Sequence, residues 1–301
     1  MPGFLKVFIF FILIFISALF FSCRSEKGDT VKTDAECQRI ASTAPSITET
    51  LFALGLGSRV VAVSSNCTFP DEVSGISKVG KVLDLSYEAI LLSKPDTVIL
   101  SDYNASRALN LERAGIRTIV VDHSNLYGFI DSIDTIAREC KKEEIAVKMR
   151  KKFESALSER EARTVETSPE VLIVVGREYL EKGIKDIYVA GRDRFYDEIL
   201  KIFNLNNSYK GKLSYPKIQV EGLMTMDPDI IIEVITDRSY SIKDLEKIRK
   251  EWQSLKNVKA VSSDKVFVVN KDYWSIPGPR FVKIVTDLQE IISSEKGMAI
   301  K

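Results

Sequence analysis

The chain has 301 residues, of which 45% are hydrophobic and 28% are charged, a composition typical of a globular protein with one large or two medium domains. Its 43 basic and 42 acidic residues leave a net charge of +1. This balance lacks the basic excess that a nucleic-acid or other polyanionic partner would favour, so we expect no nucleic-acid partner.

The first segment has the layout of an export signal. Lys6 is followed by an unbroken apolar run over residues 7–21, and then by Ser22, Cys23 and a polar stretch. A cysteine directly after a small residue resembles the cleavage site of bacterial lipoproteins. We therefore expect residues 1–22 to be a lipoprotein signal peptide, with Cys23 acylated as the mature N-terminus.

Two residues depart from this pattern, because Phe20 and Phe21 stand where a leucine and a small residue are usual. The alternative is an uncleaved anchor helix, although the apolar run is shorter than the roughly 20 residues that span a bilayer. Either interpretation places the rest of the chain on the periplasmic side of the cell envelope.

Residues 23–38 are polar and without periodicity, so they are interpreted as a tether.

Three further cysteines follow at Cys37, Cys67 and Cys140, and their spacing shows no metal-binding pattern. An exported protein can form disulfides, but an odd count leaves at least one thiol unpaired. A Cys37–Cys67 bridge is the pairing considered, and whether it forms is left open; Cys140 is interpreted as a small buried hydrophobe.

Residues 39–141 alternate between strand and helix patterns. Pro45 and Ser46, followed by Thr48 and Glu49, predict a helix start with a hydroxyl cap and an acidic first turn. Further strands are expected at residues 59–65, 96–102 and 116–122, and further helices at 86–94, with Ser86 as the cap, and at 105–115. Such alternation predicts an N-terminal α/β lobe with a parallel sheet covered by helices on both faces.

The pattern changes after residue 126, where no strand is expected up to about residue 164. Ile145, Met149, Phe153 and Leu157 recur at helical spacing among charged residues. Residues 142–165 therefore predict one long amphipathic helix of roughly 35 Å.

Residues 166–301 resume the alternation and predict a C-terminal α/β lobe. Strands are expected at residues 171–176, 188–191, 228–236 and 264–270, and helices at 194–205, 222–227, 244–255 and 279–294. The two lobes share one theme, a glutamate-bearing helix followed by x-Pro-Asp and an apolar strand, in YEAILLSKPDTVIL and VEGLMTMDPDIIIE.

This theme carries a family resemblance. Residues 39–80, residues 85–100 (LSYEAILLSKPDTVIL) and residues 257–280 (NVKAVSSDKVFVVNKDYWSIPGPR) resemble the periplasmic binding proteins for cobalamin, ferric siderophores and haem. The resemblance covers nearly the whole mature chain. It implies the type III fold, in which two lobes with parallel sheets are joined by one long backbone α-helix. A single helix resists bending, so small lobe motions are expected on ligand binding.

In that family, one glutamate per lobe pairs with arginines of the ABC importer permease subunits. The matching residues are Glu88 and Glu221, and two separated carboxylates suit an encounter that must be oriented. The alternative is that each is an ordinary exposed carboxylate that favours the helix dipole.

The resemblance also places the ligand between the lobes, on the loops that follow the strands. The candidate ligand-binding residues are Pro45, Ser46, Asn66, Phe69, Val82, Asp102, Tyr103, Arg177, Tyr179, Tyr188, Tyr215, Asp272, Tyr273 and Trp274. The aromatic members suit a flat, weakly polar macrocycle, and Tyr215 and Trp274 are the leading candidates. Arg177 could hold a ligand carboxylate or amide by a forked hydrogen bond, or form a surface ion pair instead.

His123 is the chain's single histidine. It follows a predicted strand and is interpreted as a solvated loop residue, with a haem-iron ligand as the alternative. Zinc and manganese binders use several imidazoles, so we expect no metal site.

These features predict a solute-binding lipoprotein that captures a bulky chelate and delivers it to an ABC importer. A corrinoid such as cobalamin is the first choice, because few arginines fall in the predicted cleft loops; a ferric siderophore and then haem follow. We expect a monomer without a cofactor or catalytic residues. Two alternatives remain open, an extracytoplasmic enzyme on the same scaffold and a surface lipoprotein that binds a host macromolecule.

Overall fold

The computed structural model describes residues 37–161, 168–179, 183–192, 194–237 and 239–300, all within one compact unit that runs from Ala35 to Lys301. The expected signal peptide and Cys23 lie outside the described residues. Among the helices of the described part, none is long and apolar enough to cross a membrane.

The first lobe is built on a five-stranded sheet in the order β3-β2-β1-β6-β7. Its neighbouring strands all pair in parallel, as predicted. The strands are β1 (Ile40–Ser42), β2 (Val60–Val63), β3 (Ser77–Lys78), β6 (Thr97–Ser101) and β7 (Arg117–Val121). Every residue of the central strand β1 and of its neighbour β6 is buried, because helices cover both faces of the sheet.

Four α-helices accompany this sheet: α2 (Pro45–Ala53), α3 (Tyr87–Leu92), α4 (Ala108–Arg113) and α5 (Leu126–Glu139). The predicted Ser86 cap is confirmed, since its side chain accepts a hydrogen bond from the Ala89 amide. The predicted hydroxyl cap of α2 is wrong, because its N-cap is Ala44 and no side chain caps it. Short 3-10 turns at η2 (Gly57–Arg59), η3 (Asp71–Gly75) and η4 (Asp102–Arg107), and the hairpin of β4 (Gly80–Lys81) with β5 (Asp84–Leu85), fill the connections.

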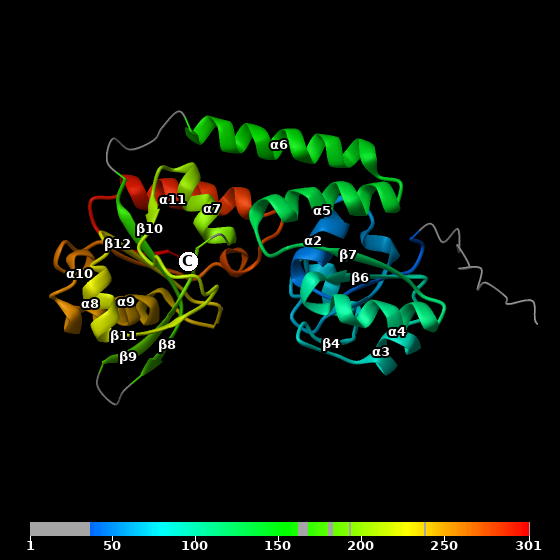
Figure 1. Ribbon diagram of the computed structural model, residues 1–301, viewed down its shortest axis with the longest axis horizontal. Helices are drawn as coiled ribbons and strands as arrows, with labels where there is room; N and C mark the ends of the chain where they lie inside the picture. The colour runs from blue at the N-terminus through cyan, green and yellow to red at the C-terminus, as the bar shows by residue number, and fades with distance from the viewer. Residues whose placement is uncertain (1–36, 162–167, 180–182, 193, 238, 301) are drawn as a thin grey trace, which may run out of the picture. The chain divides into compact units, whose positions relative to one another are not determined.

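Helix α6 (Glu143–Glu161) links the two lobes, and residues 162–165 of the expected helix lie outside the described residues. Its predicted apolar face is confirmed: Phe153 is buried in the main core, and Ile145, Met149 and Leu157 pack against it. The helix contacts α5 of the first lobe and α7 (Phe195–Ile202) and α11 (Phe281–Ser293) of the second (Figure 1). The fold is therefore α/β, with two lobes joined by one backbone helix.

The second lobe contains a seven-stranded sheet in the order β11-β9-β8-β12-β13-β14, with β10 beside β8. Its strands are β8 (Glu170–Tyr179), β9 (Ile184–Val189), β10 (Asn206–Asn207), β11 (Lys217–Gln219), β12 (Ile230–Val234), β13 (Val266–Val269) and β14 (Ala299–Ile300). The expectation of a purely parallel sheet is wrong here. Strand β9 pairs antiparallel with both β8 and β11, because β8 and β9 form a hairpin.

The other helical segments of this lobe are α8 (Val220–Met226), α9 (Ile242–Glu251), η5 (Trp252–Leu255), α10 (Lys259–Ser262) and η6 (Asp272–Ser275). Helix α9 begins with a capping box formed by Ser241 and Asp244. The long predicted helices at residues 194–205 and 279–294 are confirmed as α7 and α11.

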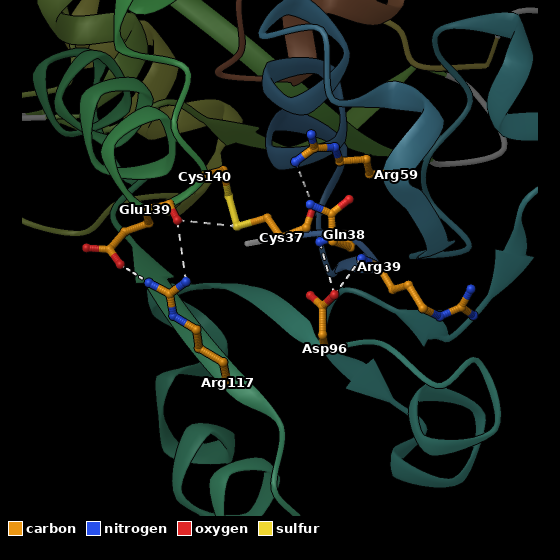
Figure 2. Close-up of a disulfide and its surroundings, with 8 residues drawn as sticks. All are labelled: Cys37, Gln38, Arg39, Arg59, Asp96, Arg117, Glu139 and Cys140. Carbon is orange, nitrogen blue, oxygen red and sulfur yellow. Dashed lines mark hydrogen bonds and ion pairs between the residues drawn. A yellow bond between two sulfur atoms is a disulfide. The ribbon is translucent and has the colours of Figure 1, made fainter. Parts of the chain in front are cut away.

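The cysteine pairing differs from the one considered from the sequence. Cys37 bonds to Cys140, 103 residues away (Figure 2). Cys67 is a buried free thiol, and burial raises its pKa to about 11. Cys37 and Gln38 thus belong to the fold rather than to the tether. The Asp96 carboxylate fixes the start of the first lobe by accepting hydrogen bonds from the backbone amides of Gln38 and Arg39, at 3.0 and 2.8 Å.

Candidate functional site

Residues of both lobes line a cavity of about 340 Å³, within the range of small-molecule sites. Its first-lobe residues are Ala44, Pro45, Ser46, Val82, Ser101, Tyr103, His123 and Ser124. Its second-lobe residues are Val175, Phe195, Tyr196, Tyr215, Val234, Thr236, Trp274, Ser275 and Pro277. Several follow the carboxyl ends of β1, β6, β7, β12 and β13, where ligands of open α/β sheets bind.

The lining combines aromatic rings, aliphatic groups and hydroxyls. None of the described residues that line the cavity is Lys, Arg, Asp or Glu. An apolar wall with a few polar groups suits a ligand of low charge, because an ionised group left unpaired in such a site would lose its hydration.

Trp274 forms a fixed part of this wall and is only 1% exposed. Its indole Nε1 donates to Asp287 Oδ2 at 2.8 Å, and its carbonyl oxygen accepts from the Tyr196 hydroxyl. The Tyr196 ring stacks beside it with centroids 6.4 Å apart. Asp287 also accepts from Tyr273 and Lys271, so one buried carboxylate orients three side chains behind the cavity.

Two tyrosines of the wall, one from each lobe, are largely exposed to solvent. Tyr103 is 61% and Tyr215 51% exposed. The pKa of Tyr215 is raised, first by its partial burial and then by the Tyr103 phenol. The Tyr215 loop can approach the sheet because Gly191 has no side chain; a Cβ there would lie 1.9 Å from the Leu213 carbonyl oxygen.

His123 is buried, with 5% exposure, so the interpretation of a solvated loop residue is wrong. Its Nδ1 lies 2.6 Å from Ser46 Oγ and its Nε2 lies 2.6 Å from Ser132 Oγ. Burial lowers the pKa of His123 to about 4, although the Asp122 charge opposes this shift. The imidazole is therefore neutral at neutral pH.

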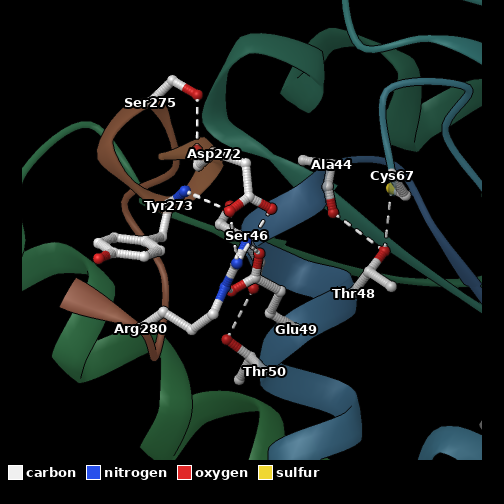
Figure 3. Close-up of polar contacts among 10 residues, drawn as sticks. All are labelled: Ala44, Ser46, Thr48, Glu49, Thr50, Cys67, Asp272, Tyr273, Ser275 and Arg280. Atoms are coloured by element: carbon white, nitrogen blue, oxygen red, sulfur yellow. Dashed lines mark hydrogen bonds and ion pairs between the residues drawn. The ribbon is translucent and has the colours of Figure 1, made fainter. Parts of the chain in front are cut away.

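An ion-pair cluster joins the lobes beside the cavity (Figure 3). Arg280 donates to both carboxylate oxygens of Glu49, at 2.9 and 2.6 Å, and to both of Asp272, at 2.9 and 3.0 Å. Burial raises the pKa of Glu49, while Arg280 lowers it. The residue that was expected to supply an acidic helix start is thus a buried partner of the opposite lobe.

The structure brings together on the cavity wall a subset of the residues proposed from the sequence: Pro45, Ser46, Val82, Tyr103, Tyr215 and Trp274. A second subset supports the wall instead. Asn66 accepts from the Val82 amide, Phe69 packs its ring 4.0 Å from the Arg280 guanidinium, and Asp272 binds that guanidinium. Tyr273 donates to Asp287, and Asp102 begins the turn that carries Tyr103.

The β8–β9 hairpin takes the remaining candidates away from the described cavity wall. Arg177 is absent from the described lining, and its buried guanidinium pairs with Glu233 at 2.8 Å and Glu251 at 3.2 Å. Tyr188 donates to Glu178 at 2.7 Å on the same hairpin. Tyr179 is the last residue of β8 and is absent from the described lining.

Sequence reasoning missed Phe195, Tyr196, Val234 and Thr236, which also line the cavity. Thr236 could have been found, since it follows the apolar run of β12 as Tyr103 follows that of β6. Phe195 and Tyr196 carried no such signal, because they open helix α7 and do not directly follow a strand.

The site has limited chemical capacity. Among the described residues there is no group of His, Cys, Asp and Glu that could hold a metal ion. Ser46 and His123 do place a hydroxyl against an imidazole, but Ser132 occupies the position where hydrolases use a carboxylate. A hydroxyl stabilises a protonated imidazole poorly, so the arrangement suits binding better than nucleophilic attack.

Glu88 and Glu221 lie in the first turns of α3 and α8, and both are exposed. Each occupies the same place in its lobe, before the turn that leads into β6 or β12.

Comparison with known proteins agrees with this architecture. The family model described as periplasmic binding protein matches residues 40–273. The ABC transporter substrate-binding lipoprotein YvrC of Bacillus subtilis is 30% identical over 278 residues, which cover 89% of this chain and 83% of the relative. The vitamin B12-binding protein of Vibrio campbellii is 26% identical over 266 residues, or 87% of this chain and 92% of the relative.

Solved structures share the fold. The periplasmic haem-binding protein of Vibrio cholerae gives a TM-score of 0.72 at 22% identity and covers 86% of this chain and 100% of its own. The periplasmic vitamin B12-binding protein of the same organism gives 0.70 at 22% identity, with 85% and 98% covered. With the family model matched from the first strand to the turn at Tyr273, the chain belongs to the periplasmic binding protein family.

Proposed function

We propose that the protein is the substrate-binding component of an ABC importer and that its ligand is a corrinoid. The observation that carries the proposal is the uncharged lining of the cleft, which contains the aromatic residues Trp274, Tyr196 and Phe195 together with several serines. Corrinoids present a flat macrocycle edged with neutral amides, which matches apolar walls and scattered polar groups.

Haem and ferric siderophores fit this lining less well. Haem carries two carboxylates, and ferric siderophore complexes are often anionic, so both favour arginine or lysine in the site. Arg280 lies near the cleft, but its guanidinium is already bound by Glu49 and Asp272. A vitamin B12-binding protein that matches most of the chain supports the choice of a corrinoid, while haem-binding proteins share the fold, so haem is the main competing ligand.

Isothermal titration calorimetry with cyanocobalamin tests the ligand, with haem and a ferric siderophore as comparison titrants. We expect tight binding of cyanocobalamin and a loss of at least about tenfold in Trp274→Ala, which removes a buried ring from the wall. Tyr188→Ala is the matched control and should bind as the wild type does. Tight binding of haem without any heat from cyanocobalamin would remove the corrinoid from the proposal.

We further propose that Glu88 and Glu221 dock the loaded protein onto the permease subunits. Both carboxylates are exposed at equivalent sites of the two lobes, so together they fix an orientation. In proteoliposomes, the double variant Glu88→Arg, Glu221→Arg should keep its ligand affinity and lose stimulation of the importer's ATPase. The control is Glu154→Arg, Glu290→Arg, which reverses two other exposed carboxylates; equal loss in both variants would contradict specific docking.

Residues 1–22 are proposed as a lipoprotein signal peptide that leaves Cys23 acylated and the protein anchored on the periplasmic side. Cys23→Ser should release the protein into the soluble fraction after export. Retention in the membrane at the mass of the full-length chain would favour the uncleaved anchor helix. The protein is proposed to act as a monomer, which sedimentation of the soluble variant checks.

A further inference from the structure

A chain of hydrogen bonds runs from a backbone carbonyl to the cavity wall. Ser132 Oγ lies 2.6 Å from the Phe129 carbonyl oxygen, His123 Nε2 lies 2.6 Å from Ser132 Oγ, and Ser46 Oγ lies 2.6 Å from His123 Nδ1. Ser132 is 3%, and Ser46 and His123 are each 5% exposed.

The Phe129 carbonyl oxygen fixes which atom donates and which accepts in each of these hydrogen bonds. A carbonyl oxygen cannot donate, so the short contact with Phe129 requires the hydroxyl proton of Ser132 to lie between the two oxygens. Ser132 can then only accept from His123, which puts the imidazole proton on Nε2. Nδ1 is left as an acceptor and takes the hydroxyl proton of Ser46.

We infer that Ser46 Oγ faces the cavity as a hydrogen-bond acceptor and selects ligands that place an N–H or O–H donor against it. The proton of Ser46 is turned toward His123, and only its lone pairs remain for a ligand. A carboxylate at the same place would meet a second acceptor and lose its own hydration, which disfavours it. This inference deepens the proposed function and rests on it for the choice of ligand probe.

The first test needs no ligand. Because His123 is the chain's single histidine, ¹⁵N-histidine labelling of protein without a histidine tag gives the signals of one imidazole. We expect the neutral tautomer with the proton on Nε2 at pH 7. A proton on Nδ1, or a doubly protonated ring, would overturn the inference.

The second test compares cyanocobalamin with the set of derivatives in which one peripheral amide is hydrolysed to a carboxylic acid. We expect at least one derivative to bind the wild type at least about tenfold more weakly than the parent compound. In Ser132→Ala the imidazole can place its proton on Nδ1, which frees the Ser46 hydroxyl to donate. The preference for amide over acid should therefore shrink, and the tautomer signal should change.

Ser208→Ala is the matched control, since it removes another buried serine hydroxyl, 4% exposed, that is not among the described residues lining the cavity. It should keep the wild-type preference. Equal binding of all the acids and the parent by the wild type would overturn the inference, as would an unchanged preference in Ser132→Ala. A protein with the Nε2 proton that binds no cyanocobalamin would contradict the corrinoid proposal while supporting the direction of the hydrogen bonds.

Discussion

The single histidine links the cleft wall to the pH dependence of stability. Its pKa is about 4 in the folded protein, below the 6.5 of an unperturbed imidazole. As the pH falls below about 6.5, the imidazole takes up a proton in the unfolded chain but stays neutral in the folded protein. The free energy of unfolding therefore decreases as the pH falls from about 6.5 towards 4. The full difference corresponds to about 3 kcal/mol in the free energy of unfolding.

We predict that urea unfolding at pH 7, 5.5 and 4 shows a steeper loss of stability for the wild type than for His123→Gln. Glutamine does not titrate, so the difference between the two proteins isolates the imidazole from the carboxylates that also titrate in this range. A difference in unfolding free energy that stays constant from pH 7 to pH 4 would show that His123 is not held neutral by burial.

Asp287 is the residue that we expect to hold Trp274 in place. Asp287→Asn keeps the shape but removes the charge that Lys271 and Tyr273 also use, so we predict a loss of about 2 kcal/mol in unfolding free energy. Ligand affinity should fall as well, because the indole loses its fixed orientation. Thr286→Ala, on the exposed face of α11, should change neither quantity; an Asp287→Asn protein with wild-type affinity would refute the positioning role.

At the scale of elements, α2 is anchored by the opposite lobe. Glu49 is 4% exposed and depends on Arg280 for its charge partner. We predict that Arg280→Met costs about 3–5 kcal/mol in unfolding free energy, because it leaves a buried carboxylate unpaired. Arg150→Met, which breaks a more exposed pair with Asp134, should cost under about 1 kcal/mol.

A double-mutant cycle gives the decisive comparison. Glu49→Gln combined with Arg280→Met should be more stable than Arg280→Met alone, because the variant no longer buries an unpaired charge. If the double variant loses the sum of the two single losses, Glu49 and Arg280 are not coupled.

Periodic patterns in the sequence predicted where helices and strands lie. The direction in which strands pair, and hence which side chains reach the cavity, depends on contacts between distant residues. The α6 face at Ile145, Met149 and Phe153 could be read from spacing alone, because burial repeats at each turn. Strand spacing did not reveal that β9 runs antiparallel to β8, since a fully buried strand has the same composition in either direction. This hairpin places Tyr188 and Arg177 outside the described lining of the cavity, although the sequence predicted both as ligand-binding residues.

Local rules also gave a misleading account of the α2 start. Ser46 and Glu49 have the residue types of helix caps, yet both side chains leave the helix, one for His123 and one for Arg280. Their partners lie 77 and 231 residues away in sequence. Contacts over such separations leave no trace in a single sequence, which also explains why the Cys37–Cys140 pairing was not found.

For the whole molecule, the disulfide closes the entire first lobe into one loop. It joins the first described residue to the end of α5, just before the backbone helix. Restricting so long a loop in the unfolded chain stabilises the fold by about 2–4 kcal/mol. We predict that Cys37→Ser, Cys140→Ser lowers the unfolding free energy by this amount, and that dithiothreitol then has no further effect.

The wild type provides the control for this experiment, since reductant should bring its stability down to that of the double variant. Cys67 takes no part in the bridge, so in protein that carries Cys23→Ser the number of reactive thiols should rise from one to three on reduction in denaturant. Equal stability of the oxidised wild type and the double variant would contradict the prediction.

The uncharged cleft wall and the exposed glutamates respond differently to ionic strength. A ligand of low charge gains nothing from counter-ion effects, so its dissociation constant should stay within about twofold between 0.05 and 0.5 M sodium chloride. The proposed encounter with the importer through Glu88 and Glu221 should slow over the same range, as the Debye length shrinks. A cell in saline surroundings would then load this protein as readily as one in fresh water, and any limit on uptake would lie at the membrane.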